Sequence, residues 1–218
     1  MASRVVSASA RSVGKLNRQT TAFFLCDIQE KFRTSIHAFE SVVQVAQKMS
    51  QASKALNIPL IVTEQYPRGL GSTANEINID HAELVEAKTK FSMVTEGVLS
   101  KLVELKVESV VLYGIESHVC VLQSCLDLLE HNYGVHVLAD GVSSMNHPEI
   151  SIALKRMAQS GAHIVSSESM LFQLAGDAKD PCFPAIRDLV KEHQAAARQN
   201  KLLFTAAATT MAAAGGQL

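Results

Sequence analysis

The chain has 218 residues, of which 47% are hydrophobic, so it is long and apolar enough for one domain with a sizeable core. Its 20 basic and 21 acidic residues give a formal net charge of −1, which supplies no global field for a nucleic acid or an anionic membrane. No apolar stretch approaches the roughly 18 residues needed to span a bilayer. We therefore expect a soluble protein that acts on a small-molecule substrate, with no nucleic-acid partner and no membrane partner.

The four cysteines are typical of a reducing compartment. They sit mostly inside apolar runs and form neither a CxxC pair nor a ladder of regular spacings; they are Cys26, Cys120, Cys125 and Cys182. This pattern predicts free thiols and a cytoplasmic protein.

The two ends of the chain differ in composition from its middle. The first 26 residues contain four basic residues and no acid, which is the composition of a mitochondrial transit peptide and equally that of a disordered tail. Residues 196–218 are rich in Ala, Thr and Gly and lack apolar periodicity. We expect a basic flexible segment at residues 1–17, with mitochondrial targeting left open, one globular domain at residues 18–195, and a flexible tail at residues 196–218.

Between the ends, short apolar runs alternate with amphipathic segments, which is the pattern of a parallel α/β sheet. Strands are predicted at residues 21–27, 59–63, 84–88, 109–113, 135–139 and 162–165. Helices are predicted at residues 41–56, 93–105, 117–129, 148–160, 168–174 and 183–193. Right-handed crossovers place helices on both faces, which gives a Rossmann-like three-layer α/β/α sandwich. Ligands of such sheets lie beyond the carboxyl ends of the strands, so polar residues there rank first.

A cysteine follows the fourth of these strands. Residues 110–113 form an apolar run typical of a buried parallel strand, which Gly114 is expected to end. Ser117 is a suitable N-cap for the helix that follows, and this puts Cys120 at about the third helical position. Backbone N–H groups and the positive end of the helix dipole favour a thiolate there. A small buried core cysteine is the alternative reading, and residue type alone favours it.

Charged residues also lie at the ends of the first and third predicted strands. Asp27 ends the first strand, where both a helix cap and a proton-accepting carboxylate are common roles. Lys88 and Lys90 flank Thr89, and a lysine folded over the strand ends could keep Asp27 ionised. Spacing alone does not choose between these lysines, because residues two apart in an extended segment face the same side.

Other polar signals are weaker. Asp140 follows the fifth strand, where a helix cap or an ordering role in a loop is the more natural interpretation. His118 is only two residues from Cys120 and should project from a different face, which argues against a Cys/His pair. The eight histidines form no HExxH, HxH or Cys/His cluster, and a glycine-rich phosphate loop is absent. We therefore expect no metal and no cofactor.

Four ordered motifs resemble one known family. They are FLCDIQEKF at 24–32, VTEQYP at 62–67, AKTKFS at 87–92 and GIESHVCV at 114–121. Together they resemble the isochorismatase-like cysteine hydrolases over about residues 18–193, in the order that the family requires. The resemblance implies a six-stranded parallel sheet in the order 3-2-1-4-5-6, which puts the first and fourth strands side by side.

The resemblance also implies a catalytic triad of Asp27, Lys88 and Cys120. Lys88 is chosen over Lys90 because the family's lysine stands a few residues before an aromatic and a small polar residue, as Lys88 does before Phe91 and Ser92. Enzymes of this family often have a non-proline cis peptide just before the nucleophile, which would join Ile115 and Glu116 here.

Further roles complete the predicted site. The backbone N–H groups of Glu116 and Cys120 are expected to form an oxyanion hole. The aromatic residues Phe32, Tyr66 and Phe91 are candidates for contact with the substrate.

Two departures from the family limit the activity that is expected. Nicotinamidases of the family bind a metal through an Asp-x-His motif and a further His, whereas this chain has Glu64 and Gln65 after the second strand, so nicotinamidase activity is disfavoured. True isochorismatases lack the cysteine, so Cys120 points to acyl chemistry. The expected reaction is hydrolysis of a small amide or related C–N bond through a thioester on Cys120. The alternative is a catalytically weak member that regulates a protein partner, and the resemblance also implies a homo-oligomer.

Overall fold

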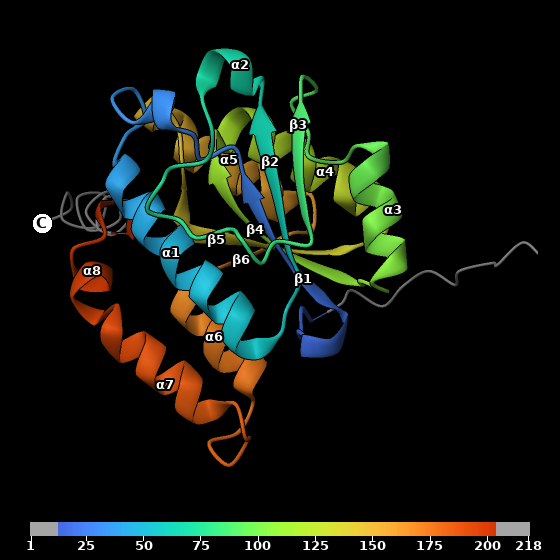
Figure 1. Ribbon diagram of the computed structural model, residues 1–218, viewed down its shortest axis with the longest axis vertical. Coiled ribbons are helices and arrows are strands. Elements are labelled where there is room, and N and C mark those ends of the chain that lie inside the picture. The colour runs from blue at the N-terminus through green and yellow to red at the C-terminus, as the bar shows by residue number, and fades with distance from the viewer. Residues whose placement is uncertain (1–12, 204–218) are drawn as a thin grey trace, which may run out of the picture.

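The computed structural model describes residues 13–203 and contains one parallel sheet of six strands (Figure 1). The strands are β1 (Thr21–Cys26), β2 (Leu60–Gln65), β3 (Leu84–Lys88), β4 (Ser109–Ile115), β5 (Gly134–Ser143) and β6 (His163–Val165). Their order in the sheet is β3-β2-β1-β4-β5-β6, and each neighbouring pair is parallel. The predicted fold class and strand order are therefore confirmed.

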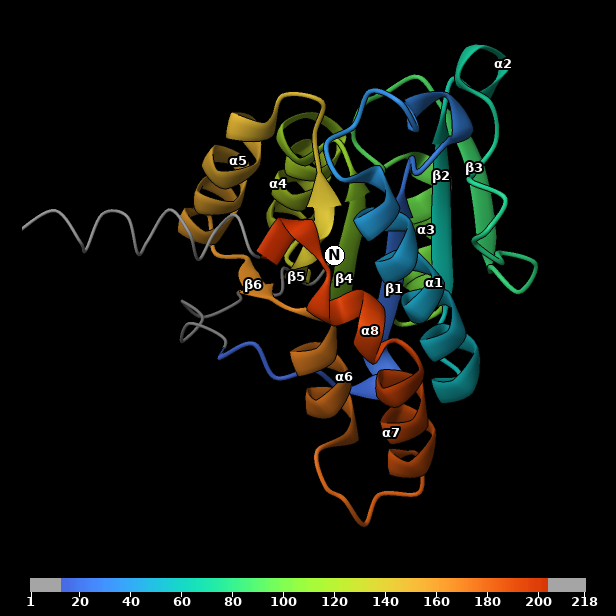
Figure 2. The ribbon, with the colours of Figure 1, turned by 90° about the vertical axis from the view of Figure 1, so that its left-hand side faces the viewer.

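Helices cover both faces of the sheet, as Figure 2 shows from the side. The helices are α1 (Phe39–Leu56), α2 (Pro67–Leu70), α3 (Glu96–Glu104), α4 (Leu122–Glu130), α5 (His147–Gln159), α6 (Ser167–Ala175), α7 (Phe183–Glu192) and α8 (Gln194–Arg198). Three shorter turns, η1 (Arg18–Thr20), η2 (Glu30–Phe32) and η3 (Ser117–Val121), complete the described elements. Helices α1, α6 and α7 contribute to one layer, and α3, α4 and α5 to the other. None of the helices within residues 13–203 has the length and apolarity needed to cross a membrane.

The apolar core is split into two clusters by the sheet. Phe23 and Leu25 belong to the cluster beneath α1, whereas Phe24 and Cys26 belong to the cluster beneath α3 to α5. All six residues of β1 are buried, because side chains alternate between two covered faces and no face of this strand meets solvent. Cys120 belongs to the same cluster as Cys26, so the two thiols lie on one side of the sheet.

Two predicted boundaries near the strand ends are wrong. Strand β4 continues through Gly114 to Ile115, because Gly114 has a φ of 128° that lets the strand bend and carry on. The helix after it does not begin with Ser117 as its N-cap. Its first turn is a π-turn preceded by Glu116, and the buried Ser117 hydroxyl has no hydrogen-bond partner among residues 13–203.

The fifth strand is also longer than its apolar run indicated. It extends through Asp140 to Ser143, whereas the sequence predicted an end at residue 139. Asp140 accepts a hydrogen bond from the N–H of Ser167 at 2.8 Å, so it caps the start of α6 from within the strand.

The terminal segments lie partly outside the described residues. Most of the basic segment 1–17 and residues 204–218 of the Ala-rich tail are outside the described range. The boundary expected at residue 195 falls inside α8, and Asn200 and Leu202 beyond it are buried. At the other end, Arg18 pairs with Asp180 at 2.8 Å.

Candidate active site

A buried ion pair joins the first and third strands of the sheet. Asp27 follows β1 with a φ of 51°, which turns its carboxylate out of the strand direction. Lys88 is the last residue of β3, and its Nζ lies 2.7 Å from Asp27 Oδ2. Both side chains are only 1% exposed. A buried pair of this kind is stable only if further hydrogen bonds satisfy the remaining donors and acceptors.

Those further hydrogen bonds are present. The ammonium of Lys88 also donates to Gln65 Oε1 at 2.7 Å and to the Phe91 carbonyl at 2.8 Å, so all three of its protons have acceptors. The Thr63 hydroxyl donates to Asp27 Oδ1 at 2.8 Å. The parallel register places Thr63 beside Cys26, and Gln65 beside Lys88, so the strands themselves bring these groups together.

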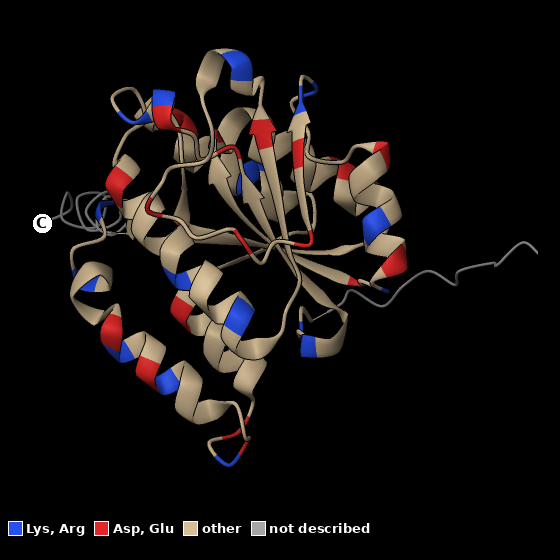
Figure 3. Cartoon of the chain, in the orientation of Figure 1, with Lys and Arg blue, Asp and Glu red and all other residues tan. Residues whose placement is uncertain are grey.

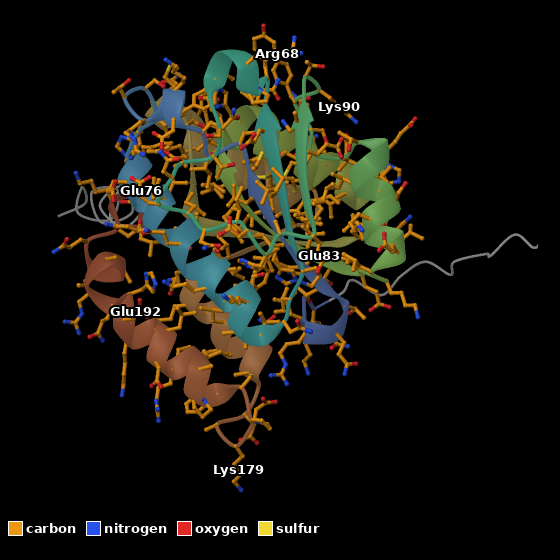
Figure 4. The ribbon with its side chains drawn as sticks, viewed as in Figure 1. Arg68, Glu76, Glu83, Lys90, Lys179 and Glu192 are labelled. Carbon is orange, nitrogen blue, oxygen red and sulfur yellow. The ribbon has the colours of Figure 1, made fainter. Side chains whose placement is uncertain are left out.

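Lys90, the alternative lysine, takes no part in this network. Its Nζ lies 3.0 Å from Asp127 Oδ2 and also donates to the Val94 carbonyl at 3.0 Å. Its side chain is 55% exposed and lies at the outer edge of the molecule beyond β3 in Figure 4. Sequence spacing did not choose between the two lysines. The structure does, because Lys88 is the one that contacts Asp27.

A second thiol lies against the same carboxylate. Cys26 Sγ donates to Asp27 Oδ2 at 3.6 Å. Burial raises the pKa of the Cys26 thiol well above its usual range, and a hydrogen bond with the Cys120 thiol and the charge of Asp27 raise it further. Cys26 is therefore a neutral thiol that donates to Asp27 and lies in the same core cluster as Cys120.

Cys120 lies in the π-turn η3 that follows β4, and it is 7% exposed. The peptide bond between Ile115 and Glu116 is cis, as the resemblance implied. The carbonyl of Glu116 accepts hydrogen bonds from Val119 N–H at 3.0 Å and Val121 N–H at 3.1 Å. No hydrogen bond within residues 13–203 uses the Glu116 N–H as its donor, so this group is available to a ligand.

The side chain of Ser124 fixes the turn that carries Cys120. Its hydroxyl donates to the Cys120 carbonyl at 2.6 Å and accepts from Met93 N–H at 2.8 Å. This bridge ties the turn to the loop between β3 and α3. His118, by contrast, has its Nδ1 2.9 Å from the Ser144 hydroxyl, which is consistent with the expectation that it does not pair with Cys120.

Strands β1 and β4 approach each other closely beside the site. Gly114 is paired with Cys26 across these strands, and a Cβ at position 114 would lie 2.1 Å from the Cys26 carbonyl oxygen. Only glycine fits there. The absence of a side chain at position 114 lets the end of β4 lie directly beside the residue that precedes Asp27.

The three aromatic candidates for substrate contact lie at different depths. Tyr66 is 55% exposed and Phe91 is 51% exposed, whereas Phe32 is half-buried and packs against the core cluster beneath α1. Phe91 is tied to the ion pair through its carbonyl. The role of these three residues stays a prediction.

The residues described offer no ready metal site. Within residues 13–203 no three His, Cys, Asp or Glu side chains are grouped so that they could hold a metal ion. Glu64 accepts hydrogen bonds from the N–H and hydroxyl of Thr73 at 2.7 Å and 2.8 Å. Its carboxylate therefore orders the loop after β2.

Three residues of the network are not singled out by the sequence. Cys26 reads there only as a buried free thiol, Thr63 as a strand residue, and Gln65 as one of several loop residues. Their common signal is position, since each lies at or next to the carboxyl end of β1 or β2. Only the register of the strands reveals that they meet Asp27 and Lys88.

Asp27, Lys88 and Cys120 all lie at the carboxyl ends of strands of this sheet or in the turn that follows one. The family model for the Isochorismatase domain matches residues 21–169, which include all of these groups. The chain belongs to the isochorismatase domain family.

Individual relatives agree with this assignment. Isochorismatase domain-containing protein 1 of Salmo salar is 46% identical over 82% of this chain and 64% of its own length, so the chain spans just under two thirds of that relative. Isochorismatase domain-containing protein 2 of Xenopus laevis is 45% identical over 85% of this chain and 90% of its own length. Among solved structures, the MAR1 ribonuclease of Caenorhabditis elegans is 41% identical, with a TM-score of 0.78 over 81% of this chain and 92% of that one.

Proposed function

We propose that this protein is a cysteine hydrolase that cleaves a small amide or related C–N bond through a thioester on Cys120. Membership of the isochorismatase family supports a hydrolase at the level of the family. The observation that carries the finer proposal is the buried Asp27–Lys88 pair, whose carboxylate accepts from Cys26, a thiol in the same core cluster as Cys120. Burial of such a pair costs free energy. A proton-accepting role for Asp27 beside a nucleophile would account for its presence.

In the first half of the reaction, Asp27 accepts the proton of the Cys120 thiol, and the sulfur attacks the carbonyl carbon of the substrate. The C–S bond forms as the carbonyl π electrons move to oxygen, and the N–H groups of Glu116 and Cys120 hold the resulting oxyanion. Donors of this kind contribute on the order of 10²-fold to 10³-fold in rate. Asp27 then gives the proton to the leaving nitrogen as the C–N bond breaks, which leaves a thioester.

In the second half, Asp27 accepts a proton from water and the hydroxide equivalent attacks the thioester carbon. The C–S bond breaks, the proton returns from Asp27 to the Cys120 sulfur, and a carboxylic acid leaves. Lys88 keeps Asp27 ionised between these two proton transfers. Each half therefore begins and ends with the same charge on the enzyme, and no cofactor is needed.

The test is a screen of small amides and ureides with detection of the acyl-enzyme by intact mass. We expect at least one substrate to add its acyl mass to the wild-type protein and to release its amine. Peptide mapping should locate the added mass on Cys120. Cys120→Ser should leave the fold unchanged and lower turnover by about 10³-fold or more, because a hydroxyl is a far weaker nucleophile than a thiol.

Cys125→Ser is the matched control, since Cys125 is a buried cysteine of the adjoining helix α4. It should retain turnover on the same substrate. A Cys120→Ser variant with full activity on a confirmed substrate would overturn the nucleophile assignment.

Ribonuclease activity is the second candidate, because solved relatives at about 40% identity are called MAR1 ribonucleases. Binding of RNA depends mainly on cations that neutralise phosphates. The formal net charge of the chain is −1, and Figure 3 shows basic and acidic residues interspersed along the ribbon in this view. Lys88 is already paired with Asp27, and its three protons have protein acceptors.

An RNA oligonucleotide assay with the wild type and Cys120→Ser separates the two candidates. We expect no RNA cleavage that depends on Cys120. If the wild type cleaves RNA and Cys120→Ser does not, the substrate of this site is a phosphodiester and the amide proposal is wrong.

A further inference from the structure

A cavity lies among the helices on the side of the sheet opposite to Cys120. It has a volume of about 490 Å³, which is within the range of small-molecule sites. Its walls come from α1, β5, the start of α6 and from α8, and these helices lie on the same side of the sheet (Figure 2). None of the residues that line it belongs to the Asp27–Lys88 network.

The base of this cavity contains a buried lysine. Lys48, on α1, is 4% exposed and lines the cavity. Within residues 13–203 its ammonium makes neither a hydrogen bond nor an ion pair, in contrast to the fully bonded Lys88. Burial lowers the pKa of Lys48, while the charges of Asp140 and Glu168 oppose that effect. A desolvated ammonium without an acceptor is unfavourable, and an anion that enters the cavity would supply one.

The acids that share the cavity do not fill that role. Both carboxylate oxygens of Asp140 accept hydrogen bonds from Ser167, one from its N–H at 2.8 Å and one from its hydroxyl. No N···O distance of 4.0 Å or less joins Asp140 or Glu168 to Lys48 among the described residues. Glu168 is exposed at the rim. The two acids therefore moderate the field of Lys48 without binding its ammonium.

The rim of the cavity is both cationic and apolar. Arg198, the last residue of α8, is exposed and lines the cavity, and it forms no ion pair within residues 13–203. Phe172 and Leu203 also line it, and they are 41% and 38% exposed. An aromatic ring and an aliphatic side chain on the wall favour a ligand with an apolar part next to its charge.

We infer that this cavity binds a small organic anion. Its carboxylate or phosphate group pairs with Lys48 and Arg198, and its apolar part lies against Phe172 and Leu203. The site is separate from the candidate active site and does not depend on the hydrolase proposal.

Isothermal titration calorimetry with matched probes tests this inference. Benzoate and phenyl phosphate carry the two candidate anionic groups on the same ring, and benzamide is the uncharged analogue. We expect saturable binding of at least one anion and none of benzamide. The anion that binds more tightly identifies the preferred group.

Variants then locate the binding. Lys48→Met keeps an unbranched side chain that is one atom shorter and removes the charge, and it should weaken binding of the preferred anion by about 10-fold or more. Arg198→Gln should weaken it by only about 2-fold to 5-fold, because exposed ion pairs contribute little. Lys54→Met removes one charge from an exposed position of the same helix and should leave the affinity unchanged. Circular dichroism verifies that each variant is folded.

Three results would overturn the inference. They are equal affinity of the anion for Lys48→Met and the wild type, equal affinity of the wild type for benzamide and benzoate, and the absence of saturable binding for both anions. Binding of the preferred anion that survives in Cys120→Ser but is lost in Lys48→Met shows that the two sites are distinct.

Discussion

Cys26 donates its thiol proton to the carboxylate of its neighbour Asp27, at an Sγ to Oδ2 distance of 3.6 Å. The same oxygen accepts a hydrogen bond from Lys88 at 2.7 Å. Oδ2 is thus directed toward the side of the sheet where Cys120 lies, while Oδ1 is held by Thr63. One oxygen of Asp27 is positioned for proton exchange with a thiol, and the other anchors the carboxylate.

Loss of Lys88 should be far more costly than loss of Lys90. Lys88→Met leaves the Asp27 carboxylate buried without its cation, which we expect to lower the free energy of unfolding by about 3 to 5 kcal/mol. Lys90→Met removes a pair whose lysine is 55% exposed, and should cost less than about 1 kcal/mol. Urea unfolding followed by circular dichroism measures both. Adding Asp27→Asn to Lys88→Met should recover part of the loss, and an equal cost for the two lysines would contradict the prediction.

The cysteines should differ sharply in their reaction with iodoacetamide near neutral pH. Burial raises the pKa of Cys125 to about 12 and that of Cys26 well above its usual range, so neither forms a thiolate while the protein is folded. Both are also fully buried. We expect Cys120 to be alkylated faster than either, as measured by peptide mass mapping over time. Equal rates of labelling for Cys26 and Cys120 in the folded protein would contradict the prediction that Cys120 is the more reactive thiol.

Two glycines with similar backbone conformations should respond differently to alanine. Gly114 has a φ of 128° and Gly161 a φ of 110°, so both substitutions strain the backbone. Only at Gly114 does the new Cβ meet another atom, the Cys26 carbonyl oxygen at 2.1 Å, whereas nothing lies within 4 Å at Gly161. We expect Gly161→Ala to cost about 1 to 3 kcal/mol and Gly114→Ala to cost more than about 4 kcal/mol or to prevent folding. Thermal unfolding of the two variants measures the difference.

His136 should make the protein sensitive to acid. It is 1% exposed, its Nδ1 has no hydrogen-bond partner among residues 13–203, and its ring stacks on His163 at 4.9 Å. Burial, followed by the charge of His163, lowers the pKa of His136 from 6.5 to about 4. Between these values the unfolded chain binds a proton at this residue and the folded chain does not. Stability is therefore lost as the pH falls through this window, by up to about 3 kcal/mol.

The melting temperature measured from pH 7 to pH 4.5 tests this contribution. His136→Gln should flatten the decline, whereas substitution of the exposed His131 by glutamine should leave it unchanged. An equal decline in the wild type and His136→Gln would show that other groups govern the acid sensitivity.

Much of the sheet was predictable because β1, β2 and β4 are largely buried on both faces and therefore have apolar runs as their sequences. The spacing of these runs does not determine the order of the strands, which only the resemblance to the family could predict. The π-turn at Cys120 was missed because Ser117 and the apolar residues after it match the pattern of an ordinary helix start. The tail beyond residue 195 offered little to predict from, since alanine-rich residues carry little periodicity even where Asn200 bonds to the Asp140 carbonyl.

For the site, the sequence could indicate which residues end strands but not which side chains meet. Lys88 and Lys90 are equivalent in an extended segment, and only the pairing of Gln65 with Lys88 directs one of them across β2 to Asp27. The position of Cys26 depends on the same kind of information, because only the packing of β1 against the turn after β4 puts it in one core cluster with Cys120.

The loop between β3 and α3 is held at three backbone positions. Gln65 binds the Thr89 carbonyl, Lys88 binds the Phe91 carbonyl, and Ser124 binds the Met93 N–H. With its main chain fixed in this way, the freedom that remains at Phe91 is rotation of its half-exposed ring about the side-chain bonds. Motion at Phe91 would then occur by rotamer exchange, which takes picoseconds to nanoseconds for exposed side chains, rather than by the slower opening of a loop.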